Sequence, residues 1–337
     1  MYSALVPEIL AKYGIESSKI FPAQKGYRNE SYKVELRGGD EANLIFFKRE
    51  PQIVDRVNRA DAVARIASNY HLPVRIRRDY RLVRLREDSV AGLYSYLPGL
   101  TISWEAYTMK HIKLLGWAMA DLHTALGPVH DPSLTYHKVT DELSGLVKAM
   151  AVYFKSPTVE KAMRQKLGVT LESSRLDDFP DLLDSLATHP EQQMLHLDMV
   201  RGNVLFENNT HDQRWSIGNI SITGIIDFEK TAYGHILFDL ARSLAFLHVD
   251  CVSKEPVKIY KYFLKSGYEK RGGRPLDLTA NFDGQSYESI LQELVNMYLV
   301  YDFYKFLVHT PYESLDDNHH YIRTRNILID HAMLRYL

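Results

Sequence analysis

The sequence has little of several features that mark large classes of proteins. It contains a single cysteine, Cys251, so no disulfide can form within the chain, and a reducing compartment suits it best. Its formal net charge is −1, so no whole-protein field draws it to nucleic acid or acidic lipid. No stretch approaches the ~20 apolar residues that a membrane-spanning helix needs. These absences argue against a disulfide scaffold, a strongly charged binding protein and a membrane protein.

The opening stretch "MYSALVPEILAKYG" has no basic segment followed by a long apolar run. We therefore expect no secretory signal and a cytoplasmic location. A hydrophobic content of 45% with 25% charged residues is the balance of a chain that buries a large core. A length of 337 residues suggests about two domain-sized units.

The first hundred residues are rich in short β-like runs separated by Gly, Asp and Asn turns. A short helix over 6–13, ending at Gly14, comes before them. A segment with apolar residues at helical spacing interrupts them at 53–71. The β-like runs lie at 31–36, 43–50, 81–87 and 90–97. The order strand, strand, helix, strand, strand predicts a small antiparallel sheet with one helix.

After Gly99 the pattern is mostly helical, apart from β-like runs at 203–207 and 222–229. We therefore predict an α+β fold with two lobes, a β-rich lobe over 1–98 and a larger helical lobe over 99–337. A ligand would bind in the cleft between them, since clefts between domains are common binding sites.

Polar residues gather in the otherwise apolar stretch "MLHLDMVRGNVLFENN" at 194–209. Asp198 and Asn203 lie five residues apart on a loop that enters a strand, and Asp227 ends another strand 24 residues later. A hairpin of these strands would place Asn203 and Asp227 at one edge. Their oxygens suit Mg²⁺, and Asp198 would orient a hydroxyl and accept its proton. We expect His196 to fix the loop.

The β-rich lobe should supply charge for nucleotide phosphates. Lys48 ends an apolar run, and we expect Asp61 on the following helix, with Asp55 behind it, to steady its ammonium group. Asn29 and Ser31, in the turn before the first strand pair, would lay polar groups over phosphate. That turn has one glycine, so an ordinary hairpin turn is an equal alternative.

Together these segments resemble the aminoglycoside phosphotransferase and choline kinase family, the small-molecule branch of the protein-kinase-like fold. The matching pieces are "GYRNESYKV", "IFFK", "LYSYLPG", "LGWAMADLH", "HLDMVRGNVLF" and "GIIDFEKTAYGHILFDLAR". The resemblance implies ATP bound between the lobes, with adenine on the connection formed by Tyr94, Tyr96 and Leu97. It also implies phosphate contact by Lys48, Mg²⁺ at Asn203 and Asp227, Asp198 as the base, and Asp239 as a brace for the loop.

The chain departs from the family pattern at several places, among them Leu197 after His196, where a small residue is commoner, and the segment 199–201 before Gly202. The small-lobe helix has no glutamate for Lys48, Glu229 follows "IDF" where protein kinases have glycine, and no "APE" segment follows. The last departure disfavours protein substrates and favours a small-molecule hydroxyl. Aminoglycosides, choline or ethanolamine, and homoserine-like amino acids stay open as acceptors. Glu229 and Asp302 are candidates to contact the acceptor, with capping and core packing as their alternatives.

Two other classes of function are open. The chain is either an active enzyme or a nucleotide-binding pseudokinase with a regulatory role, and the presence of Lys48, Asp198, Asn203 and Asp227 favours the enzyme. Six of the twelve residues from 75 to 86 are arginine, which fits a nucleic-acid surface or, as we expect, an exposed strand pair with its charges in water. We predict a small-molecule partner, no nucleic acid and no membrane, and the sequence leaves the oligomeric state open.

Overall fold

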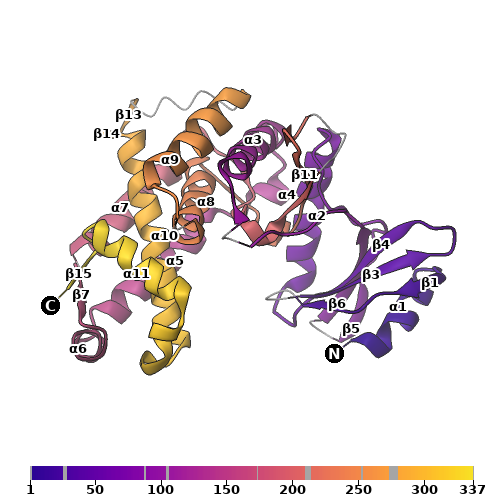
Figure 1. Cartoon of the computed structure of the whole chain (residues 1–337), viewed down its shortest axis with the longest axis horizontal. Coiled ribbons are helices and arrows are strands. Elements are labelled where there is room, and N and C mark those ends of the chain that lie inside the picture. The colour runs from indigo at the N-terminus through magenta and orange to yellow at the C-terminus, as the bar shows by residue number, and fades with distance from the viewer. Residues whose placement is uncertain are drawn as a thin grey trace.

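The structure is a computed structural model that describes residues 2–25, 29–86, 89–103, 106–172, 174–208, 214–251, 253–272 and 280–336. A β-rich part from the first hundred residues lies beside a larger, mainly helical part (Figure 1). The predicted α+β class is confirmed. The predicted boundary at 98–99 falls between the last strand of the sheet and the next helix, and the division into two lobes stays a prediction.

The β-rich part is a six-stranded antiparallel sheet with the order β1-β3-β4-β6-β5, and β2 pairs with β3. The helices α1, Val6–Lys12, and α2, Ile53–Asn69, accompany it. The strands are β1 Ser17–Ile20, β2 Gln24–Lys25, β3 Glu30–Leu36, β4 Glu41–Phe46, β5 Val83–Arg86 and β6 Ser89–Ser95. The predicted order of strands and helix is confirmed, while β1 and β2 were not expected.

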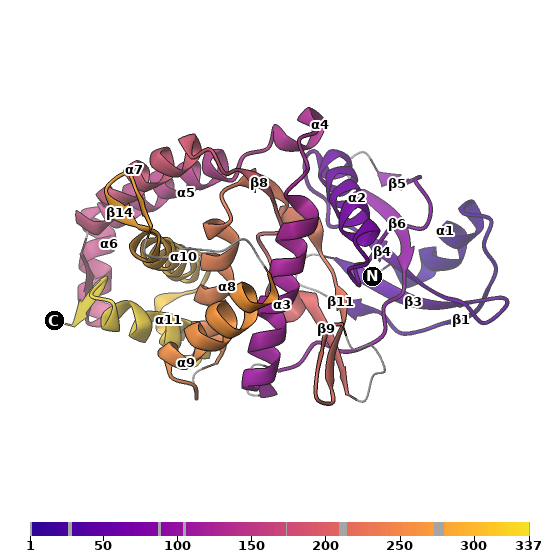
Figure 2. The same cartoon turned by 90° about the horizontal axis from the view of Figure 1, so that it is seen from above.

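Alternation along β4 gives the sheet two different faces. Leu44 and Phe46 pack with α1, whereas Ile45 and Phe47 pack with Ile53 and Val57 of α2. The opposite edge of α2, from Ala60 to Ala67, packs into the core of the helical part. Helix α2 therefore lies between the sheet and α3, as Figure 2 shows.

The helical part is built around α8 and α10, which pack along each other. Its helices are α3 Met109–Leu126, α4 Pro132–Thr135, α5 Val139–Phe154, α6 Pro157–Ala162, α7 Ser174–Thr188, α8 Leu237–Asp250, α9 Pro256–Tyr260, α10 Tyr287–His309 and α11 His319–Asp330. Short strands join them: β7 Val169–Leu171, β8 Gln193–Leu195, β9 Val204–Asn208, β10 Ser216–Ile217, β11 Ile220–Ile225, β12 Ala232–Gly234, β13 Asn281–Phe282, β14 Gln285–Ser286 and β15 Leu334–Tyr336. Among the described residues, no helix is long and apolar enough to cross a membrane.

One hairpin connects the two parts. Strands β9 and β11 pair antiparallel, Leu100 bridges to Phe206, and Val74 bridges to Ile225. The hairpin is thus held both by the chain that leaves β6 and by the chain that leaves α2.

Candidate active site

The hairpin brings Asn203 and Asp227 together. Val204 faces Ile225 across the two strands, and the Ile226 amide donates to the Asn203 carbonyl at 2.9 Å. Asn203 ends the 3-10 turn η4, Arg201–Asn203, and Asp227 precedes the turn η5, Phe228–Lys230. The two side chains therefore start from neighbouring positions at one end of the hairpin.

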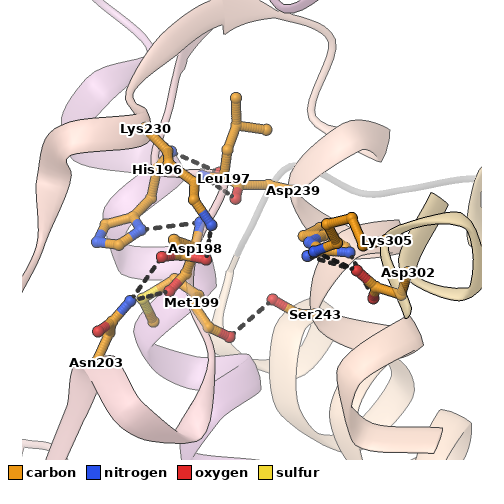
Figure 3. Close-up of polar contacts among 11 residues, drawn as sticks. His196, Leu197, Asp198, Met199, Asn203, Lys230, Asp239, Ser243, Asp302 and Lys305 are labelled. Atoms are coloured by element: carbon orange, nitrogen blue, oxygen red, sulfur yellow. Dashed lines mark hydrogen bonds and ion pairs between the residues drawn. The ribbon is translucent and has the colours of Figure 1, made fainter. Parts of the chain in front are cut away.

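Asp198 lies beside Asn203 and has a defined orientation. The Asn203 side-chain amide donates to Asp198 Oδ2 at 2.9 Å and to the Asp198 carbonyl at 2.9 Å. Lys230 Nζ lies 2.7 Å from Asp198 Oδ1 (Figure 3). Sequence reasoning missed Lys230, although it follows the "IDFE" segment directly. A carboxylate, an amide and an ammonium group thus converge at this point.

Asp239 of α8 fixes the loop that carries Asp198. This fully buried carboxylate accepts hydrogen bonds from the amides of His196, at 2.8 Å, and Leu197, at 2.7 Å, and from His123 Nε2 at 3.2 Å. Burial by itself would raise the pKa of Asp239, but the bond from His123 and these amides lower it overall. Leu197 has φ +61°, a conformation that costs a non-glycine residue free energy and that Asp239 helps to hold.

His196 also supports the loop. Its Nδ1 accepts the Asp198 amide at 3.2 Å, and its ring packs on Phe228 with the ring centres 4.5 Å apart. Burial lowers the pKa of His196, so the ring is neutral at pH 7. These contacts agree with the expected role in fixing the loop.

Asp227 has the electrostatics of a cation ligand. It adopts φ +65°, and burial followed by the charge of Asp198 raises its pKa. A divalent ion would relieve this repulsion, and Mg²⁺ needs few protein ligands because water and phosphate complete its shell. Within the described part of the chain no three His, Cys, Asp or Glu side chains gather as a complete metal site. The two carboxylates and one amide therefore fit a metal that arrives with phosphate, and do not form a closed structural site.

The expected pair between Lys48 and Asp61 is not formed, and this prediction was wrong. Lys48 lies two residues beyond β4 with an exposed side chain, and its amide donates to Asn29 Oδ1 at 3.2 Å. The Asp61 carboxylate instead lies 3.0 Å from Arg65 Nε and 3.4 Å from Arg77, whose amide also donates to it at 3.0 Å. Asp61 thus fixes α2 to the segment before β5. Asp55 is exposed.

A different ion pair joins α2 to the hairpin. The Asn29 side-chain amide donates to Glu229 Oε1 at 2.6 Å, and Arg56 of α2 lies 3.1 Å from Glu229 Oε2. Arg56 also contacts Glu50. We expected the helix to carry the acid of an ion pair, as Asp61, but in this pair the helix carries the cation, Arg56. The Glu229 carboxylate, a candidate acceptor contact, is thus engaged within the protein.

Ser31 and Tyr94, two of the other residues expected at the nucleotide, share one face of the sheet. Ser31 faces Ile45, which faces Gly92 in turn, and Tyr94 follows in the next row. Tyr94 packs edge-on against Phe47, with ring centres 6.1 Å apart. Tyr96 and Leu97 follow β6, and Leu97 lies against the hairpin at Gly224.

Two cations on this face escaped the sequence analysis. Lys33 Nζ lies 4.1 Å from the centre of the Tyr96 ring. Burial lowers the pKa of Arg75 to about 10, and the charge of Asp227 partly opposes that shift. The expectation that the arginines of 75–86 lie in water is therefore wrong for Arg75 and for Arg77, which is buried.

A cavity of about 620 Å³ opens beside the loop. Residues 200–202, between Asp198 and Asn203, form part of its wall, and Asp302 of α10 forms another part. The Asp302 carboxylate lies 3.0 Å from Arg242 and 2.8 Å from Lys305 Nζ. Asp302 thus lines a cavity and is paired with two cations, while its contact with an acceptor stays a prediction.

A family model described as "Phosphotransferase enzyme family", APH, matches residues 19–272. The chain belongs to this family. The resemblance expected from the sequence is confirmed, and the phosphotransferase is a small-molecule kinase. Mouse (Mus musculus) hydroxylysine kinase is 23% identical over 289 residues, covering 79% of this chain and 73% of the relative.

Solved structures share the fold of this phosphotransferase. An amicoumacin kinase in complex with AMP-PNP, Ca²⁺ and Ami superposes with a TM-score of 0.69 at 15% identity, covering 97% of this chain and 94% of the other. A macrolide 2'-phosphotransferase from Brachybacterium faecium has a TM-score of 0.58 at 13% identity, covering 96% of each chain. These matches agree with the predicted kinase-like architecture.

Proposed function

We propose that this phosphotransferase moves the γ-phosphate of ATP, taken as its magnesium complex, to a hydroxyl group of a small molecule. The convergence of Asp198, Asn203 and Asp227 at one end of the hairpin carries the proposal. Phosphoryl transfer needs little covalent chemistry from the protein, so positioning and charge stabilisation supply most of the rate.

Asp198 is the proposed general base. Asn203 and Lys230 contact different oxygens of its carboxylate, so the carboxylate has one preferred direction. The acceptor hydroxyl donates to Asp198, which takes the proton as the hydroxyl oxygen bonds to the γ-phosphorus and the bond from that phosphorus to the bridging oxygen of ADP breaks. Lys230 lies where it can offset charge on the transferring group. A general base of this kind contributes roughly 10²–10⁴-fold to turnover.

Asn203 and Asp227 are the proposed magnesium ligands. The raised pKa of Asp227, caused by burial and by Asp198, supports a cation at this place. Bound Mg²⁺ supplies neutralisation of the phosphate oxygens. The amide of Asn203 donates to Asp198, which leaves its carbonyl oxygen as the group for the metal.

The nucleotide is proposed to lie between the sheet and the hairpin. Tyr94, Tyr96 and Leu97 would hold the base, and Asn29, Ser31 and Lys48 would lie at the phosphates. Asp61 acts indirectly, because its bonds to Arg65 and Arg77 fix α2 against the sheet. The shared sheet face of Ser31 and Tyr94 supports this placement.

Calorimetry with ATP, with and without Mg²⁺, followed by turnover on a hydroxyl panel, tests the proposal. We expect uptake that depends on magnesium, and Asp198→Asn to bind MgATP while losing at least ~10²-fold in turnover. Asp178→Asn, an exposed acid on α7, is the matched control and should behave as wild type. Magnesium-dependent binding without hydrolysis or transfer would favour the pseudokinase, and unchanged turnover in Asp198→Asn would refute the role of Asp198.

A further inference from the structure

The cavity beside the catalytic loop is large enough for a small acceptor. Its volume of about 620 Å³ lies in the range of ligand pockets. Val200, Arg201 and Gly202 of the loop line one side, and Lys305 lines the side formed by α10. A compound in this cavity therefore lies against the loop that carries Asp198.

The acidic groups of the site are already matched by cations. Glu229 is bound by Asn29 and Arg56, away from the cavity. Asp302 faces the cavity, but Arg242 lies 3.0 Å from it on the buried side. An acceptor with several positive charges would thus find no surplus carboxylate at either residue.

The second acid of the cavity wall is balanced in the same way. Asp250 lies 3.1 Å from Arg201 Nε and 3.5 Å from His320 Nδ1. Burial lowers the pKa of His320, so this ring is neutral at pH 7 and Arg201 carries the compensating charge. The Asp250 side of the cavity therefore offers no surplus negative charge, because the charge of Arg323 also acts on Asp250.

Lys305 carries a positive charge in excess of the one carboxylate, Asp302, that it shares with Arg242. Arg242 already offsets Asp302, so the ammonium group of Lys305 is in excess, and it lines the cavity with 39% of its side chain exposed. Burial lowers the pKa of Lys305, Asp302 opposes this shift, and the charges of Arg242 and Lys230 add to it. Figure 3 shows Asp302 and Lys305 together on the side of Ser243, whose hydroxyl donates to the Met199 carbonyl of the catalytic loop.

We propose that Lys305 binds an anionic group of the acceptor, so that the acceptor is a hydroxyl compound bearing a carboxylate, as hydroxy amino acids do. This inference rests on the proposed function, because it names the substrate class of the same site. It disfavours polycationic aminoglycosides and choline. Lys305 sets the distance between the anion and the hydroxyl at Asp198, and acts as a specificity residue.

The test compares compounds that differ only in the carboxylate. L-Homoserine is paired with 3-aminopropan-1-ol, and 5-hydroxylysine with 1,5-diaminopentan-2-ol, with choline and kanamycin added. MgATP binding without acceptor is measured first, so that failure of the phosphotransferase proposal is seen separately. We expect kcat/KM to favour the carboxylated member of at least one pair by about ten- to a hundredfold, the usual effect of one charge-assisted bond.

Variants assign that preference to Lys305. Lys305→Met should raise KM for the carboxylated compound and abolish the preference while MgATP affinity is kept, and Lys305→Arg should retain it. Lys258→Met removes an exposed ammonium paired with Glu255 three residues away, and should change nothing. Three results would overturn the inference: faster transfer to choline or kanamycin, acceptance of no carboxylated compound by a chain that binds MgATP, or an unchanged preference in Lys305→Met.

Discussion

The Arg56–Glu229 pair allows a quantitative test of how α2 is held to the turn after Asp227. The perturbation is a double-mutant cycle of Arg56→Met and Glu229→Gln. The side chains are 19% and 7% exposed and 3.1 Å apart. Removing one member of a fully buried pair costs about 3–5 kcal/mol. In each single variant the remaining residue retains one partner, Glu50 for Arg56 and Asn29 for Glu229. We therefore expect each single variant to lower the free energy of unfolding by ~2 kcal/mol, with a coupling of ~1–2 kcal/mol between the two.

The assay is urea unfolding of the four proteins together with kcat/KM for ATP. The turn η5 follows Asp227 directly, so a displaced Glu229 also displaces the proposed metal ligand, and kcat/KM for ATP should fall in both single variants. The control cycle uses Glu8 and Lys12, a 2.8 Å pair that is 58% and 49% exposed and should couple by less than about 0.5 kcal/mol. A coupling for Arg56 and Glu229 as small as in this control would refute the reasoning.

Three further perturbations test the supports of the site and the pH response. Asp239→Asn should lower the free energy of unfolding by about 3 kcal/mol at neutral pH. Because the folded pKa of Asp239 is lowered, the stability that it provides is present above its ordinary pKa of 3.8 and is lost as pH falls through the lower folded value. Between neutral and acid pH the variant should therefore lose less stability than the wild type. His248→Leu should remove an acid-sensitive step, because burial lowers the pKa of His248 from 6.5 to about 4. The folded protein therefore loses ~3 kcal/mol of stability as pH falls across that window, and thermal melts at pH 7 and pH 4.5 should differ less in the variant. Lys230→Met should lower turnover by about tenfold or more while MgATP affinity is nearly unchanged, as fixed-time assays of turnover and calorimetry would measure. Turnover equal to that of the wild type would show that Lys230 does not offset charge at Asp198.

The sequence allowed prediction of those parts of the site that lie on one local element. Asp198 and Asn203 are five residues apart, and the run after Asn203 has a clear β pattern, so the hairpin that meets Asp227 could be expected. The order of strands and helix in the sheet followed from periodicity for the same reason. Local spacing restricts where such side chains can point.

Pairings between distant elements were not predictable from spacing. The expected Lys48–Asp61 contact placed an acid on the helix that follows the strand, but the strand ends at Phe46. Asp61 instead faces Arg65 of its own helix and Arg77 of the next segment. The Arg56–Glu229 pair joins residues 173 positions apart, which no local pattern fixes. The arginines of 75–86 also led to a wrong expectation, because a charged run indicates solvent unless tertiary packing buries it, as it does for Arg77.

The four residues from Asp227 to Lys230 lead to four different places. Asp227 approaches Asn203, the ring of Phe228 supports the His196 ring, Glu229 reaches across to α2, and Lys230 returns to Asp198. Shifting this tetrapeptide by a single position would exchange every one of those destinations at once. An insertion or deletion there should therefore be far more damaging than any one substitution, and the tetrapeptide acts as the registration point between sheet, helix and loop.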